Sequence, residues 1–172
     1  TGDFIVSEPE QNWVLKIDWK DGKGSGKVLW RLGKDGDFKV ESKDPSPWFS
    51  YQHDAGFEPV GSDLLTLTDD GAVTGTSDKP GVRGQVWKLD EDKHIATLVY
   101  SAPVGAGTIC CGSMQTLKNG GYSAVAGWSL PIQGRTAEID KDGKIVFALE
   151  ISGAVDYRSY RVQDMYSAPT KQ

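Results

Sequence analysis

The sequence has few of the residues from which metal and redox centres are built. It contains two histidines and two cysteines in 172 residues. The Asp- and Gly-rich stretches at 18–26, 69–71 and 140–143 lack the ligand spacing of a calcium hand and are typical of turns. Ser113 and Ser129 lack the Gly-x-Ser-x-Gly context of a hydrolase nucleophile, and no glycine-rich loop opens a helix to hold phosphate. We therefore expect no metal and no cofactor.

Positive charge and long hydrophobic runs are also missing. The net charge is -5 and the isoelectric point is about 5.0, with no local cluster of Lys and Arg to attract a phosphate backbone. No stretch approaches the roughly 18 consecutive apolar residues that a membrane span needs. We expect neither nucleic acid nor a membrane among the partners.

The two cysteines, Cys110 and Cys111, are neighbours. Two cysteines do not make a disulfide framework, and a bridge between adjacent residues departs from ordinary disulfide geometry. Adjacent residues in a strand also point to opposite faces. We therefore expect two buried or half-buried thiols.

Glycine and aromatic residues, in contrast, are abundant, with 21 Gly, 6 Trp and 6 Tyr. Closely spaced strands and tight turns use these residues, so the composition favours an all-β fold. The 38% hydrophobic and 25% charged residues are ordinary for one globular domain. No segment keeps a period of 3.6 residues over three turns, which argues against helices.

A hairpin whose first strand ends in an apolar residue followed by Asp occurs three times, at 14–18, 86–90 and 136–140. A further strand follows each copy, and a strand that opens with a turn residue precedes each. The following strands are 28–32, 95–100 and 145–151, and the preceding ones are 2–6, 62–67 and 120–125. Strand candidates at 49–55 and 112–117 complete four strands in the second and third units.

Four-stranded units at this spacing predict consecutive blades of a β-propeller, each an antiparallel meander. We expect one propeller segment over residues 1–172: a blade at 1–33 without its first strand, a linker at 34–48, blades at 49–102 and 103–152, and a closing strand at 153–166. Such a segment is too short to close a ring. It would need further blades of a larger protein or other copies of the chain. A β-sandwich of the same strands is the alternative.

The densest group of candidate functional residues is Trp48, Tyr51, Gln52, His53 and Asp54. His53 would begin the innermost strand of its blade and could face the central channel, where propellers bind ligands. There it could act as a nucleophile or general base. The alternative is a histidine hydrogen-bonded between blades, with Asp54 capping a turn.

His94, in contrast, lies in a charged hairpin tip, where we expect it to be inert. The arginines Arg83, Arg135, Arg158 and Arg161 could hold an anion such as sulfate, although an arginine on a strand is more often a rim charge.

In order and spacing, several segments resemble the arylsulfotransferase propeller family. The most specific are Trp-Arg-Leu-Gly at 30–33 and Gln-His-Asp-Ala at 52–55; Gly-Asp-Phe at 36–38, Leu-Thr-Leu at 65–67, Asp-Asp-Gly at 69–71 and Arg-Gly-Gln-Val-Trp-Lys-Leu-Asp at 83–90 accompany them. The resemblance implies a six-bladed propeller, of which this would be the C-terminal half. It also implies an extracytoplasmic, periplasmic or secreted, location.

The resemblance further implies transfer of a sulfuryl group between phenols without a nucleotide donor, through a transiently sulfated histidine in the channel. Of the family's positions only His53 has a counterpart here, as a sulfate-binding or acid/base histidine. The family's nucleophilic histidine lies in a later blade, whereas this chain has no histidine after His94. The loop after Gly71, where a sulfate-binding arginine would be sought, has none until Arg83.

Two functions follow from these residues. The first is an arylsulfotransferase-like enzyme with His53 as the catalytic residue and Trp48, Tyr51, Gln52, Asp54 and Arg83 around the substrate. The second is a non-catalytic propeller of the same family that binds a small aromatic or anionic, sulfated ligand, or a protein. A structural interaction fragment is a third reading.

Overall fold

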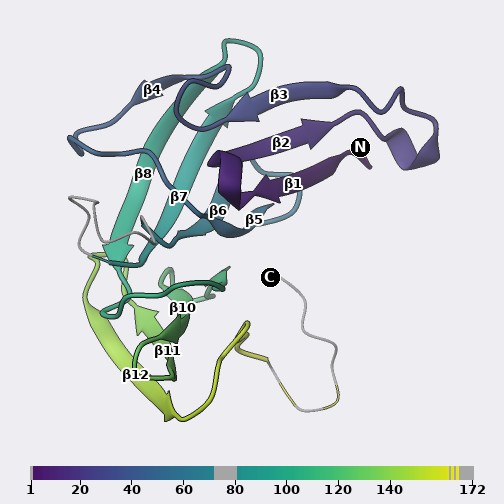
Figure 1. The fold of residues 1–172 in the computed structure, drawn as a ribbon. Helices are drawn as coiled ribbons and strands as arrows, with labels where there is room; N and C mark the ends of the chain where they lie inside the picture. The colour runs from purple at the N-terminus through teal and green to yellow at the C-terminus, as the bar shows by residue number, and fades with distance from the viewer. Residues whose placement is uncertain (1, 72–80, 163, 165, 167–172) are drawn as a thin grey trace.

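The computed structural model describes residues 2–71, 81–162, 164 and 166. It is all-β, with 47% of residues in strands and 4% in helices, which confirms the fold class expected from composition. In the described part of the chain the strands form three sheets, and within each sheet consecutive strands of a meander are hydrogen-bonded. Figure 1 shows the sheets following one another along the chain.

The first sheet has the order β1-β2-β3, formed by β1 (Phe4–Glu8), β2 (Trp13–Ile17) and β3 (Val28–Leu32). The short 3-10 turn η1 (Pro9–Gln11) joins the first two strands, and Asn12 closes it in the left-handed region with φ of 57°. A second 3-10 turn, η2 (Lys20–Gly22), lies between β2 and β3. These are the three strands that the sequence predicts for this unit.

The second sheet has the order β4-β8-β7-β6-β5. Its strands are β4 (Lys39–Glu41), β5 (His53–Phe57), β6 (Leu64–Asp69), β7 (Arg83–Asp90) and β8 (Ile95–Pro103). The strand β4 lies inside residues 34–48, which the sequence predicts to be a linker. It pairs in parallel with β8, whose edge has free backbone N–H and C=O groups. A strand of three residues is too short to be predicted from its sequence pattern.

The third sheet has the order β12-β11-β10-β9 and consists of β9 (Met114–Thr116), β10 (Tyr122–Ser129), β11 (Gln133–Ile139) and β12 (Ile145–Ser152). Residues 153–162, which include most of the closing strand predicted at 153–166, contain no strand, and residues 163 and 165 lie outside the described residues. The backbone of this segment forms hydrogen bonds with side chains of the third sheet instead. For example, the Arg161 N–H donates to Gln115 Oε1 at 2.8 Å. An isolated contact of this kind does not build a ladder.

Large apolar side chains join the first sheet to the second. Trp87 on β7 is fully buried, and Trp48 stacks on it with ring centroids 5.1 Å apart. The buried members of this cluster come from both sheets and the segments between them: Val14, Trp30, Leu32, Phe38, Phe49, Leu65, Leu67, Trp87, Leu89 and Ala96. Burial of these residues is the main force that holds the two sheets face to face.

Small residues join the second sheet to the third. A methyl group added at Gly84 would lie 3.1 Å from the sulfur of Met114 and 3.6 Å from Cβ of Ala124, so the two sheets approach closely at this point. The buried cluster between them is Val82, Ala102, Val104, Ala124, Ala126, Ala137 and Ile139. The strands thus form three sheets rather than the two that a sandwich requires, while closure into a propeller stays a prediction.

Candidate functional site

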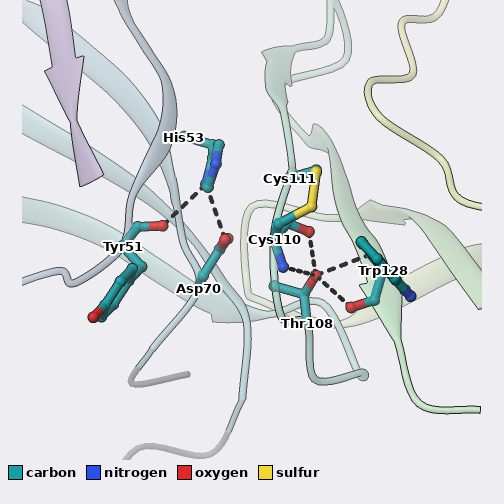
Figure 2. Close-up of a disulfide and its surroundings, with 7 residues drawn as sticks. All are labelled: Tyr51, His53, Asp70, Thr108, Cys110, Cys111 and Trp128. Carbon is teal, nitrogen blue, oxygen red and sulfur yellow. Dashed lines mark hydrogen bonds and ion pairs between the residues drawn. A yellow bond between two sulfur atoms is a disulfide. The ribbon is translucent and has the colours of Figure 1, made fainter. Parts of the chain in front are cut away.

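His53 is the first residue of β5 and pairs across the sheet with Thr68 of β6. Its ring nitrogen Nδ1 lies 3.0 Å from the carbonyl oxygen of Tyr51 and 2.9 Å from Oδ2 of Asp70 (Figure 2). Both neighbours are acceptors, so Nδ1 carries a hydrogen and donates it. The other nitrogen, Nε2, is therefore the atom at which the ring gains and loses a proton.

Burial and hydrogen bonding alter the acidity of this pair. The carboxylate of Asp70 is inaccessible to solvent, and burial raises the pKa of Asp70 to about 6. The hydrogen bond with Asp70 raises the pKa of His53 above its ordinary value, although partial burial of the ring acts in the opposite direction. The imidazolium form of His53 is therefore favoured at higher pH than in an exposed histidine.

The first sheet fixes the backbone on the N-terminal side of His53. The side chain of Asn12 accepts a hydrogen bond from the backbone N–H of Tyr51 at 2.8 Å. Gln52 is fully buried, and its Nε2 donates to the carbonyl oxygen of Trp13 at 2.8 Å. Tyr51 itself has a left-handed φ of 49°, which turns its carbonyl group onto the His53 ring. Gln52 thus positions the segment, and Tyr51 contributes its backbone oxygen.

Asp54 ties the other side of His53 to the third sheet and to the chain beyond it. Its carboxylate accepts a hydrogen bond from the Met114 N–H at 3.4 Å and from the Tyr160 hydroxyl at 3.2 Å. Arg158 Nη1 lies 3.3 Å from Oδ1 of Asp54. The charge of Arg158 slightly lowers the pKa of His53, opposing Asp70. Arg158 is therefore linked to His53 through the adjacent residue Asp54.

The two remaining predicted residues support the site from outside it. Arg83 is buried, and its guanidinium donates to Asp69 at 2.7 Å and 3.0 Å, to Asp44 at 2.8 Å and to the Ser46 carbonyl at 3.2 Å. Asp69 in turn accepts a hydrogen bond from the Ser50 N–H at 2.9 Å. Trp48 packs on Trp87, as described above. The contacts of Arg83 and Trp48 thus hold the chain that leads into His53.

Sequence reasoning missed three residues around His53, namely Asp70, Arg158 and Tyr160. Asp70 was assigned to a turn. The sequence did contain a signal for it: His53 begins its strand, its antiparallel partner Thr68 lies near the end of the next strand, and the turn that contains Asp70 follows directly. Arg158 was considered only as one of four arginines. Its contact with Asp54 spans about a hundred residues of sequence, and only the packing of the tail on the third sheet creates it.

The structure overturns the expectation of two thiols, because Cys110 and Cys111 form a disulfide (Figure 2). The argument from alternating faces assumed that the two cysteines lie within a regular strand, and they do not. It lies ahead of β9, and Cys111 has a left-handed φ of 71°. With this backbone the two side chains lie on the same side and their sulfur atoms meet.

Thr108 and Trp128 hold the disulfide in place. The Thr108 hydroxyl lies 3.0 Å from the Trp128 carbonyl oxygen and accepts a hydrogen bond from the Trp128 N–H at 3.0 Å. The Cys110 N–H also points to this hydroxyl at 3.3 Å, and Cys110 and Trp128 form an isolated β-bridge. Thus the disulfide is anchored to the end of β10.

In the described ranges no three His, Cys, Asp or Glu side chains lie close enough together to hold a metal ion. Among the same residues no helix is both long and apolar enough to cross a membrane. Within the site, His53 is a group that can gain and lose a proton, and Arg158, paired with the adjacent Asp54, is a cation.

The fold and the site define an all-β protein of meander sheets that carries a histidine–carboxylate pair at one strand end. Comparison with protein families identifies it more closely: the family model described as Arylsulfotransferase (ASST) matches residues 1–152. The chain belongs to the arylsulfotransferase family. A search of curated proteins found no match.

Proposed function

We propose that this chain is part of an arylsulfotransferase-like enzyme that transfers a sulfuryl group from one phenolic compound to another, with His53 as the catalytic residue. The observation that carries the proposal is the ring of His53, whose Nδ1 is held by Asp70 and Tyr51 while Arg158 pairs with the adjacent residue, Asp54. Family membership supplies the class of reaction.

In the proposed reaction Nε2 of His53 first donates its proton. The bond between sulfur and the phenolic oxygen of the donor breaks, and the leaving oxygen keeps the electron pair and takes the proton from Nε2. The oxygen of the acceptor phenol forms the new bond to sulfur, and its proton passes to the neutral Nε2. The products are a phenol and a new aryl sulfate, and His53 returns to its starting state.

The neighbours of His53 have separate roles in this scheme. Asp70 keeps the Nδ1 hydrogen in place and stabilises the imidazolium form, whose Nε2–H is the acid for the leaving oxygen. Arg158 provides a second positive charge for the sulfuryl oxygens, because charge-assisted bonds from a guanidinium suit oxyanions. The raised pKa of His53 supports a role as proton donor near neutral pH.

We further propose that the three sheets are consecutive blades of a propeller that more blades, or other copies of the chain, complete. The strand β12 supports this, because it is the free edge of the third sheet and is exposed almost throughout. Its exposed apolar residues are Val146, Phe147, Leu149 and Ile151. The first and second sheets bury apolar residues against each other, and so do the second and third sheets. An extracytoplasmic location, as the family resemblance implies, completes the proposal.

A binding protein of the same family is the second candidate. The observation that favours it is the position of His94, the other histidine of the chain, which packs beside Phe38 with ring centroids 5.2 Å apart, on the β7–β8 hairpin. His53 is thus the histidine that this chain brings to the site, and one histidine with an arginine suffices to bind an aryl sulfate without turning it over.

The test measures release of 4-nitrophenol from 4-nitrophenyl sulfate by the full-length protein, with phenol as the acceptor. Loss of the catalytic acid predicts that His53→Ala lowers the phenol-dependent rate by on the order of 10²- to 10⁴-fold. His94→Ala is the matched control and should keep the wild-type rate. Equal rates for His53→Ala and wild type would contradict the proposal. A folded wild-type protein that binds the ester without turnover would establish the second candidate.

A further inference from the structure

The disulfide occupies the position in the third sheet that His53 occupies in the second. Leu89 lies one residue before the end of β7 and Ile139 ends β11, and their cross-strand neighbours are Asp63 and Tyr122. Five residues after Asp63 and Tyr122 lie Thr68 on β6 and Gly127 on β10. Thr68 pairs with His53, and Gly127 donates its N–H to the Cys111 carbonyl at 3.0 Å.

The disulfide segment (residues 108–116) and the strands around His53 also touch. A methyl group added at Gly112 would lie 2.9 Å from Cγ2 of Thr68, the cross-strand neighbour of His53. Two residues after Gly112, the Met114 N–H donates to the carboxylate of Asp54, which is adjacent to His53. A change in the backbone at Cys111 therefore has a short path of packed atoms to the His53 ring.

The backbone at Cys111 depends on the disulfide. Its φ of 71° lies in the left-handed region, which a residue with a Cβ seldom adopts without a local constraint. The bond between adjacent cysteines is such a constraint, because it closes a small ring that includes the peptide unit between them. Without it, Cys111 is free to move toward the extended region, and Gly112 moves with it.

Solvent access differs between the two cysteines. Cys110 is half-buried and follows Ile109, which is exposed, whereas Cys111 is 8% exposed and packs beside Gly127. Because Cys110 is the more exposed residue, we expect an incoming thiolate to attack its sulfur, with the sulfur of Cys111 as the leaving group.

We propose that Cys110–Cys111 is a thiol–disulfide exchange site whose redox state sets the environment of His53. A dithiol reductant is the co-reactant. One of its thiolates attacks Sγ of Cys110, the Cys110–Cys111 bond breaks, and Cys111 leaves as a thiolate that takes up a proton. The second thiol of the reductant then displaces Cys110 from the mixed disulfide. Two electrons and two protons pass to the protein, and the reductant becomes a cyclic disulfide.

The proposal does not require sulfuryl transfer, so its test uses the two histidines as reporters. The full-length protein is labelled with ¹³C in its histidine rings, and the His53 and His94 signals are assigned by their loss in His53→Gln and His94→Gln. Spectra are then taken across a pH series before and after treatment with dithiothreitol. Complete reduction is verified by a mass gain of two hydrogens and by capture with a trivalent phenylarsenical, a reagent specific for neighbouring dithiols.

The expected result is that reduction shifts the His53 signal and its titration midpoint and leaves those of His94 unchanged. Reoxidation should restore both. The double variant Cys110→Ser/Cys111→Ser should show the reduced pattern without any reductant, and wild type and variant should share the same circular dichroism spectrum. An unchanged His53 signal after complete reduction would overturn the proposal. So would resistance of the folded protein to dithiothreitol, or loss of the fold on reduction, since either would make the bond a purely structural link.

Discussion

The His53 segment (residues 49–57) and the disulfide segment occupy equivalent places in neighbouring sheets, yet they are stabilised in different ways. Hydrogen bonds to both neighbouring sheets hold the His53 segment, through Asn12 on one side and Met114 on the other. A covalent bond within the disulfide segment and the Thr108 hydroxyl hold its own turn. The comparison shows that equivalent positions of a repeated fold can carry different groups: the titratable His53 in the second sheet and the Cys110–Cys111 disulfide in the third.

The largest effect on stability is expected from Asp69→Ala, which removes the central anchor of the His53 segment. Asp69 is fully buried and pairs with the guanidinium of Arg83, so the change leaves a buried cation short of its partner. Breaking a buried pair in this way costs about 3–5 kcal/mol. Urea unfolding of the full-length protein measures the free energy directly.

The matched control for this variant is Asp63→Ala. Asp63 lies 3.5 Å from Lys88 in a pair whose side chains are both more than half exposed. Such a pair contributes less than ~1 kcal/mol. If the two variants lost the same stability, the contacts of Asp69 would not be what holds the His53 segment.

An intermediate loss of stability is expected from Gly127→Ala on β10, the strand next to the disulfide segment. The added methyl group would lie 2.4 Å from the Asp156 carbonyl oxygen and 2.8 Å from Cβ of Cys111. Overpacking at such a site costs about 1–3 kcal/mol. Thermal unfolding compares it with Gly107→Ala, where an added methyl group meets nothing within 4 Å. A stable Gly127→Ala protein would show that β10 and the disulfide segment separate easily.

The smallest change in structure, and the sharpest test of the His53 segment, is Asp70→Asn. It keeps the shape of the side chain but removes the carboxylate, whose hydrogen bond to the ring, followed by its charge, raises the pKa of His53. The pKa of His53 should fall, as measured by the pH dependence of its ring NMR signals. The rate of sulfuryl transfer, which needs the acid form in the proposed reaction, should then decline at a lower pH than in wild type. An unchanged pKa would mean that Asp70 does not face the ring in solution.

The same pair predicts how stability depends on pH. The folded pKa of His53 is raised above its unfolded value, so its contribution is present at low pH and is lost as pH rises through the folded pKa. The folded pKa of Asp70 is about 6 against 3.8 in the unfolded chain, so ionising this buried carboxyl also costs stability as pH rises over that interval. As pH rises from about 4 through neutrality, this pair should therefore lower the stability of wild type relative to that of Asp70→Asn.

How far the sequence predicts the site follows from the range of each interaction. Alternation and turn residues are local, so the strands β1, β2 and β3 were placed to within about two residues. The Gln-His-Asp-Ala segment at 52–55 likewise marked His53 without any structure. In contrast, β4 was taken for a linker because its strand character comes from pairing with the free edge of β8, a contact between distant residues.

The sequence by itself determined an all-β chain of repeated meanders, its family, and His53 as the residue to study, because hydrophobic period and short motifs are written in neighbouring residues. Tertiary structure alone decided that Asp70 contacts His53, that Arg158 contacts Asp54, that Arg83 supports the site through Asp69, and that Cys110 and Cys111 are bonded. The physical reason is that these contacts depend on how the sheets pack on one another and on one backbone angle, at Cys111, that local sequence does not fix.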